Sequence, residues 1–236
     1  MPDADLNIDK LAAYLHVAPA QVTKLVERGK LPGRRVGGEW RFSPAEIHHW
    51  LEERIGLSTD EELQQMEGAL RRIRGSSELA EISLAELLPV AAIAVPLAAR
   101  TRSSVIDEMA EVAAQSGWLW DPKKMADAVR AREELMPTAL DNGVALLHPR
   151  RPLPSILDRA FLAFGRSDRG LPFGSARGVL TDLFFLINST DDRTHLRTIA
   201  RLSRLLSDSA FVDALRQAPN ALAVQQTVVG FEEKLL

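Results

Sequence analysis

The sequence of 236 residues contains no cysteine, which excludes disulfide bonds, thiolate nucleophiles and thiolate metal sites. It also lacks a membrane-spanning run, because its longest apolar stretch, LLPVAAIAVPLAA, is short and contains two prolines. The polar and acidic start, MPDADLNIDK, has neither the charged nor the apolar region of a signal peptide. These absences predict a soluble cytoplasmic protein without membrane insertion.

Positive charge is not in excess either. The formal net charge of −3 provides no global field that would attract nucleic acid or membrane, so a nucleic-acid site must be a local patch. A hydrophobic share of 46% and a charged share of 26% are typical of a folded chain rather than a disordered one. The length predicts one large domain or two unequal ones.

Residues 1–55 have the pattern of a small winged helix-turn-helix domain. Apolar residues recur at helical spacing in two short segments, residues 11–17 and 20–27. A Gly37-Gly38 pair between β-type stretches predicts a hairpin, and a Ser-Pro-Ala-Glu sequence from Ser43 predicts the start of a third helix. This order of elements is that of a winged DNA-binding domain.

The second helix and the hairpin of this unit carry the residues that we expect to contact DNA. These residues are Gln21, Thr23, Lys24, Arg28, Arg34, Arg35 and Arg41. Cations contact phosphates, and polar side chains on a helix read base edges. A solvated basic face is the alternative interpretation of the cluster.

The segment LAAYLHVAPAQVTKLVERGKLPGRRVGGEWRFSPAEIHHWLEE resembles the excisionase or MerR-like small winged helix family. The resemblance implies that residues 20–27 enter the major groove and that the hairpin tip approaches the DNA backbone. Because so small a module reads few base pairs, tight specific binding is expected to need a homodimer.

The rest of the chain divides into a charged linker and a larger domain. Residues 56–82 carry a narrow apolar stripe and are expected to form a helical linker or a short dimerising helix. Residues 83–236 alternate helical and strand-like segments, which predicts an α/β domain with a central mixed sheet flanked by helices. The expected strands are residues 91–97, 143–147, 159–164 and 181–188, and the expected helices are 102–115, 122–135, 194–206 and 209–215.

Among the five histidines, His148 has the most informative position. It follows an expected strand and precedes Arg150 and Arg151, at the carboxyl end of a strand, where α/β folds place chemistry. A neutral imidazole attacks phosphorus near neutral pH, and phosphoryl transfer then needs mainly positioning and charge neutralisation. For a histidine taken alone, a loop residue bonded to the backbone is the alternative. His16, His48 and His49 have no partner at metal-ligand spacing with a carboxylate nearby. The sequence implies neither a metal nor an organic cofactor.

The stretch AREELMPTALDNGVALLHPR closely resembles the enzyme IIA domain of the mannitol/fructose type of the bacterial sugar phosphotransferase system, whose nitrogen-regulatory branch belongs to the same family. The matching positions are Arg132, Glu133, Thr138, Gly143, Val144, Ala145 and His148. Leu147 stands where the family usually has proline, a departure that removes no reactive group.

The resemblance also implies roles for individual residues. His148 is expected to be phosphorylated and Arg132 to stabilise the phosphate, with a hydroxyl contact from Thr138. His195 matches the family's second histidine at the start of a helix, where the partly positive helix end favours an anion.

Three functions remain open at this point. In the first, an HPr-like phosphocarrier protein phosphorylates His148, and the phosphate alters DNA binding by the N-terminal unit. In the second, the domain is a phosphoryl relay that passes the phosphate to an enzyme IIB during sugar uptake. In the third, it is an interaction domain in which His148 is never phosphorylated.

Overall fold

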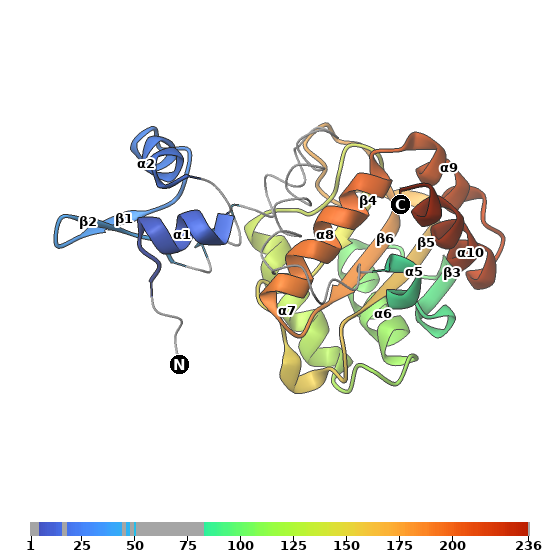
Figure 1. Ribbon diagram of the computed structural model, residues 1–236. Coiled ribbons are helices and arrows are strands. Elements are labelled where there is room, and N and C mark those ends of the chain that lie inside the picture. Colours follow the sequence, from blue (N-terminus) through green and yellow to red (C-terminus); the bar gives the residue numbers. More distant parts are fainter. Residues whose placement is uncertain (1–4, 16–17, 44–45, 48–49, 51–82, 236) are drawn as a thin grey trace. The chain divides into compact units, whose positions relative to one another are not determined.

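The chain forms two compact units, Met1–Glu81 and Ile82–Leu236, which are described separately (Figure 1). The computed structural model describes residues 5–15, 18–43, 46–47, 50 and 83–235. The predicted linker, residues 56–82, lies outside the described residues, so its boundaries stay a prediction.

The first unit consists of two short helices and a two-stranded hairpin. Its elements are α1 (Ile8–Leu15), α2 (Pro19–Glu27), β1 (Arg34–Val36) and β2 (Glu39–Arg41). Asn7 starts α1 by accepting the amide of Lys10, and proline at the first position starts α2. The backbone is helical again at residues 46–47 and 50, where the third helix was predicted. The predicted order of helices and hairpin is confirmed.

The hairpin turn of the first unit depends on two glycines. Gly37 and Gly38 have φ angles of 61° and 85°, a left-handed conformation at both central positions of the turn, and only glycine adopts it without strain. Behind the hairpin, a small core contains Leu11, Val22, Val26, Phe42 and Ile47, all buried. This core leaves the polar side of α2 exposed.

The second unit contains a mixed four-stranded sheet in the order β3-β5-β6-β4. The strands are β3 (Ile93–Leu97), β4 (Val144–Leu147), β5 (Phe161–Leu171) and β6 (Thr181–Asn188). β3 runs parallel to β5, and β4 runs parallel to β6, whereas the central pair β5 and β6 is antiparallel. The predicted α/β class with a mixed central sheet is confirmed.

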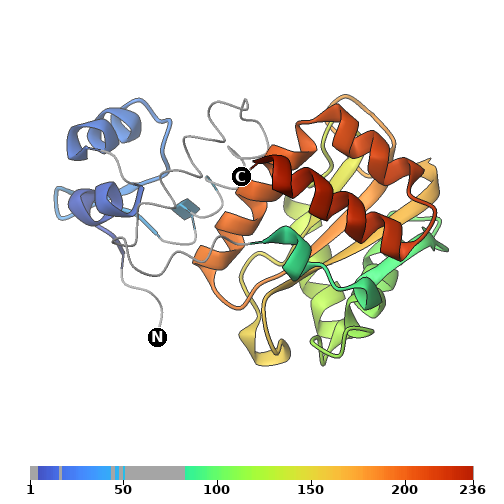
Figure 2. The same ribbon diagram turned by 45° about the vertical axis from the view of Figure 1, so that its right-hand side comes forward.

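Helices cover both faces of this sheet (Figures 1 and 2). One face packs against α6 (Arg102–Ala114) and α7 (Pro122–Leu135). The other face lies beneath α8 (Asp192–Leu206), α9 (Ser209–Gln217) and α10 (Ala221–Glu232), with the short α5 (Leu84–Leu87) against α8 and α10. Single 3-10 turns lie at Val90–Ala92, Pro154–Ile156 and Glu233–Leu235.

Four elements differ from the sequence-based expectation. The first residues expected in a strand at 91–97 form a 3-10 turn, because the strand begins only at Ile93. β5 begins two residues later than expected and continues to Leu171, beyond an irregularity in its pairing after Arg166. Helices α5 and α10 were not predicted.

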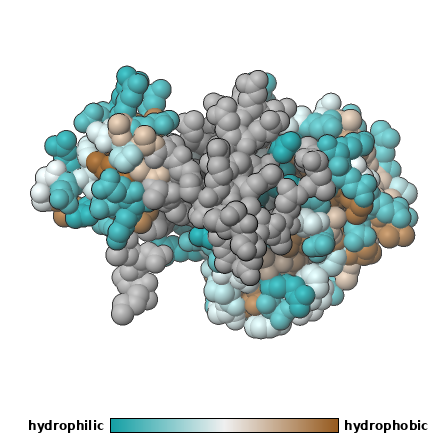
Figure 3. All heavy atoms as spheres, in the orientation of Figure 1, coloured by the Kyte–Doolittle hydropathy of each residue, from teal (hydrophilic) through white to brown (hydrophobic). Residues whose placement is uncertain are grey.

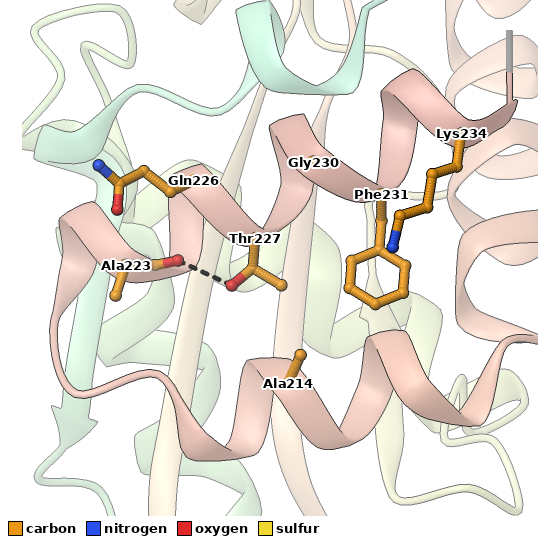
Figure 4. A pocket seen from close by; sticks show the side chains of 7 residues that line it. All are labelled: Ala214, Ala223, Gln226, Thr227, Gly230, Phe231 and Lys234. Atoms are coloured by element: carbon orange, nitrogen blue, oxygen red, sulfur yellow. Dashed lines mark hydrogen bonds between the residues drawn. The ribbon is translucent and has the colours of Figure 1, made fainter.

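The described surface of both units is largely hydrophilic in the view of Figure 3. A pocket lies between α9 and α10, where the ammonium of Lys234 stands 4.2 Å from the ring centre of Phe231 (Figure 4). Its other lining residues are Ala214, Ala223, Gln226, Thr227 and Gly230. None of the residues predicted to be functional lines this pocket.

Candidate functional site

The sheet topology brings the predicted histidines to one edge. β4 and β6 are parallel neighbours, so their carboxyl ends meet at the same edge of the sheet. His148 directly follows β4, and α8, which carries His195, begins shortly after β6. The rings of His148 and His195 have centroids 5.1 Å apart and are tilted by 56°. Both side chains are buried, with 3% and 2% of their surface exposed.

The alternation of the strands places this pair on the α8 side of the sheet. Leu147 and Leu186 pair across β4 and β6 and belong to the core beneath α6 and α7. Because successive residues of a strand face opposite sides, His148 faces α8, and so does Ser189, two positions beyond Ile187. A buried pair of imidazoles therefore lies between the sheet edge and the first turns of α8.

A backbone carbonyl determines which nitrogen of His148 carries the hydrogen. Nδ1 of His148 lies 2.8 Å from the carbonyl oxygen of Leu146. A carbonyl oxygen only accepts hydrogen bonds, so the hydrogen of the neutral ring is on Nδ1. The lone pair of the neutral ring is then on Nε2.

His195 is oriented by the start of α8 and by a serine. Asp191 caps the helix by accepting the amide and hydroxyl of Thr194 at 2.9 and 2.7 Å. His195 is the fourth residue of α8, near the positive end of the helix. Its Nδ1 lies 3.1 Å from the hydroxyl of Ser189, which is buried at the end of β6.

Arg132 lies in the last turn of α7 and is buried, with 4% of its surface exposed. Its guanidinium Nη1 donates to the carbonyl of Met136 at 2.8 Å. The chain after Met136 runs antiparallel to β4, since the Leu146 amide donates to the Thr138 carbonyl at 3.3 Å. Continuing this register aligns Met136 with His148, so Arg132 is anchored near the strand end that His148 follows.

Thr138 is engaged by a neighbouring acid. Its hydroxyl and its amide both donate to the carboxylate of Glu133, whose side chain is 1% exposed. Arg102 donates to the same carboxylate at 2.8 Å and to the Glu133 carbonyl at 2.6 Å. Glu133 accepts the only hydroxyl hydrogen of Thr138 and so holds the segment beside β4, and the expected contact of Thr138 with a phosphate stays a prediction.

The loop after His148 carries Arg150 and Arg151, both exposed. The amide of Leu153 ties this loop to the Ser189 carbonyl at 3.3 Å. Ser189, Glu133 and Arg102 received no role in the sequence analysis. Ser189 directly follows a predicted strand, and this position could have marked it as a candidate for the site. The pairing of Arg102 with Glu133 could not have been found from the sequence, because it depends on how the chain folds.

The residues predicted to contact DNA differ in exposure and in their partners within the described part of the first unit. Gln21, Lys24 and Arg28 are exposed on and just after α2, and the edge of the unit around α2 is hydrophilic in Figure 3. Thr23 donates its hydroxyl to the Pro19 carbonyl at 3.1 Å, within the helix.

The three arginines of the hairpin have partners. Arg34 is paired with Asp5 at 2.7 Å, and Arg41 with Glu39 at 2.8 Å. The guanidinium of Arg35 lies 5.0 Å from the ring centre of Trp40.

No group of acidic and histidine side chains within the described ranges has the arrangement of a metal site. In the same ranges, no helix combines the length and apolarity needed to cross a membrane.

Two family models match the chain. A model of a helix-turn-helix domain matches residues 6–55. A model described as "Phosphoenolpyruvate-dependent sugar phosphotransferase system, EIIA 2" matches residues 86–229, which include every residue of the histidine site.

Two relatives with curated descriptions match the second unit. The chain is 31% identical over 145 residues to the "PTS system fructose-specific EIIABC component" of Bacillus subtilis, covering 61% of this chain and 22% of that protein. It is 30% identical over 143 residues to the "Nitrogen regulatory protein" of Bradyrhizobium diazoefficiens, covering 60% of this chain and 91% of that protein. The chain thus spans less than a quarter of the first relative and most of the second.

Solved structures share the fold of the second unit. The nitrogen regulatory protein IIA-Ntr from Neisseria meningitidis superposes with a TM-score of 0.55 at 20% identity, covering 61% of this chain and 97% of that one. IIA mannitol from Escherichia coli gives a TM-score of 0.52 at 20% identity, covering 59% and 97%. At this identity the likeness concerns the fold alone.

Proposed function

Because the chain belongs to the family of phosphoenolpyruvate-dependent sugar phosphotransferase system EIIA 2 domains, we propose that His148 accepts and releases a phosphoryl group. The observation that carries this proposal is the buried pair of His148 and His195, in which the Leu146 carbonyl leaves the Nε2 lone pair of His148 for attack. The family match supplies the reaction class, and the site residues and their roles are part of the proposal.

The proposed transfer is a displacement at phosphorus. Nε2 of His148 attacks the phosphoryl group of a phosphohistidine donor, the Nε2–P bond forms, and the donor P–N bond breaks. The donor nitrogen recovers the electron pair, so no oxidant or reductant is needed. Nδ1–H of His148 keeps donating its hydrogen bond to the Leu146 carbonyl during the transfer. This hydrogen bond stabilises the positive charge that develops on the phosphorylated ring.

Charge neutralisation comes from groups already in place. Arg132 carries a fixed positive charge beside the end of β4, and the amino end of α8 adds a partial one. His195 provides a hydrogen-bond donor next to His148. Thr138 and Glu133 hold the segment that carries the Met136 carbonyl, to which Arg132 is anchored.

The fusion with a helix-turn-helix domain favours a regulatory purpose for this phosphorylation. We therefore propose that an HPr-like phosphocarrier protein in the cytoplasm phosphorylates His148 and that the phosphate changes DNA binding by the first unit. A phosphate adds nearly two negative charges and strong acceptors, enough to reorganise a neighbouring contact. The likeness to nitrogen regulatory proteins along most of their length supports regulation over transport.

The second candidate is a phosphoryl relay to an enzyme IIB in sugar uptake. It is supported by the likeness to a fructose-specific EIIABC component and by the shared fold with IIA mannitol, which has been solved in complex with phosphorylated IIB mannitol. In this case the phosphate on His148 passes to IIB and DNA affinity does not depend on it.

Labelling and gel-shift experiments test these proposals. The chain is incubated with labelled phosphoenolpyruvate, enzyme I and an HPr-type carrier, and incorporation of the label into the chain is measured. His148→Ala should incorporate no label, and His195→Ala should still incorporate it, but more slowly. Absence of label in the wild type with cognate carriers would instead favour an interaction domain.

Phosphorylated and unphosphorylated protein are then compared on the same DNA. Equal affinity and footprint would contradict regulation, and transfer of label to an IIB protein would favour the relay.

A further inference from the structure

Ser189 is a buried residue at the centre of the site, 2% exposed, immediately after β6. Its backbone carbonyl accepts the Leu153 amide of the loop that follows His148, at 3.3 Å. Its hydroxyl lies 3.1 Å from Nδ1 of His195. One residue therefore contacts both the loop after His148 and the second histidine.

The hydrogen bond between Ser189 and His195 has two possible directions. Either the hydroxyl donates to a lone pair on Nδ1, or Nδ1–H donates to the hydroxyl oxygen. The second direction leaves the hydroxyl hydrogen of Ser189 to find another acceptor. Within the part of the chain that the structure describes, that hydroxyl has no other hydrogen-bond partner than His195. A buried hydroxyl without an acceptor costs free energy, so the first direction is favoured.

We infer that Ser189 is a positioning residue that holds neutral His195 in the tautomer with hydrogen on Nε2. This inference rests on the proposed phosphorylation of His148 and extends it to the second histidine. His148 has its hydrogen on Nδ1 and its lone pair on Nε2, because of the Leu146 carbonyl. His195 has the reverse arrangement, so the two rings are complementary as acceptor and donor.

The complementary tautomers matter for the reaction. Phosphoryl oxygens only accept hydrogen bonds, so a neutral His195 helps to hold the phosphate on His148 only if its Nε2 carries hydrogen. With hydrogen on Nδ1, the Nε2 lone pair of His195 would repel the incoming phosphoryl group. Ser189 removes that unproductive state without requiring His195 to be protonated.

The ring nitrogens report the tautomer directly. Long-range proton–nitrogen NMR spectra of the unphosphorylated full chain should show His195 with hydrogen on Nε2 and His148 with hydrogen on Nδ1. In Ser189→Ala the His195 signals should shift toward a mixture of tautomers, whereas Ser189→Thr, which keeps the hydroxyl, should retain the wild-type pattern. Ser203→Ala is the matched control, because Ser203 is also buried and its hydroxyl, on α8, has no hydrogen-bond partner among the described residues.

The chemical consequence is measured with phosphoramidate as the donor, which transfers its phosphoryl group with release of ammonia and needs no carrier protein. We expect the phosphorylation rate of His148 to fall about two- to tenfold in Ser189→Ala, because this variant loses one hydrogen bond. The rate should be restored in Ser189→Thr. A wild-type His195 with hydrogen on Nδ1 would overturn the inference, and so would a Ser189→Ala protein with unchanged spectra and rate. If His148 is not phosphorylated at all, the proposed function fails, while the spectra of the unphosphorylated chain still decide the tautomer.

Discussion

The Glu232 carboxylate accepts a hydrogen bond from Nε of Arg201 at 2.8 Å, which joins α10 to α8, the helix that carries His195. The same carboxylate accepts the amides of Leu84 and Ala85 at 2.8 and 3.0 Å, at the start of α5. Burial works against ionisation of Glu232, but the hydrogen bonds from these amides and from Arg201 outweigh it and lower its pKa. One buried carboxylate thus joins three helices on one face of the sheet.

Glu232→Gln is therefore expected to destabilise the second unit by roughly 3 kcal/mol, because the buried Arg201 guanidinium would lose its ion pair with the Glu232 carboxylate. Urea denaturation of the full chain measures the free energy of unfolding. The adjacent Glu233 is exposed, and Glu233→Gln should change stability by less than about 0.5 kcal/mol. Equal effects of the two substitutions would contradict the role of Glu232.

The lowered pKa of Glu232 also predicts a direction for the pH dependence. Its contribution to stability is fully present above its ordinary pKa of 4.5 and is lost as the pH falls through the lower pKa of the folded state. The stability difference between wild type and Glu232→Gln should therefore shrink below pH 4.5. A difference that is the same at neutral and acidic pH would show that folding does not lower the pKa of Glu232.

The sequence was most informative where a local pattern coincides with the fold. The positions of His148, Arg132 and His195 along a matching motif, and the strand before His148, were sufficient to expect a shared site. The alternation of helices and strands was sufficient for the class of fold.

Contacts between distant segments could not be predicted in the same way. Helix α10 has apolar residues around much of its circumference and follows a short polar turn, so its periodicity gave little signal. Ser189 is one of many serines, and its contact with His195 depends on how the chain turns from β6 into α8. Arg102 and Glu133 are separated by 31 residues, and their contact depends on how α6 packs against α7.

Gly143 precedes β4 with a φ angle of 85°, and a side chain there would meet charged groups. An added Cβ would lie 2.5 Å from Nη2 of Arg216 and 3.1 Å from Oδ1 of Asp182, which are themselves hydrogen-bonded. Gly117 has a similar φ of 77° with no atom within 4 Å. Gly117→Ala should cost about 1 kcal/mol from backbone strain alone, and Gly143→Ala about 2–3 kcal/mol. Thermal or urea unfolding compares them, and equal losses would mean that the Arg216 cluster moves aside freely.

Arg132→Lys tests whether the shape of the guanidinium matters in addition to its charge. Lysine keeps the charge but loses the planar set of donors that holds the Met136 carbonyl and a phosphate together. We expect phosphorylation of His148 to slow by about tenfold to hundredfold, the range for loss of one preorganised donor. Arg130→Lys on the same helix is the control, since Arg130 pairs with Asp107 and Asp127 and should leave the rate unchanged. A wild-type rate in Arg132→Lys would remove Arg132 from the proposed mechanism.

The cations of the first unit should contribute unequally to DNA binding. Lys24 is exposed on α2 without an ion pair in the described part of the unit, whereas Arg34 is already paired with Asp5 at 2.7 Å. Each phosphate contact lowers the slope of log affinity against log salt by about 0.9. Lys24→Ala should therefore reduce the magnitude of this slope by about one, and Arg34→Ala should reduce it less, because Asp5 neutralises part of its charge. Fluorescence anisotropy with labelled duplex DNA at several salt concentrations measures both slopes, and a larger loss in Arg34→Ala would place the hairpin rather than α2 as the main phosphate contact.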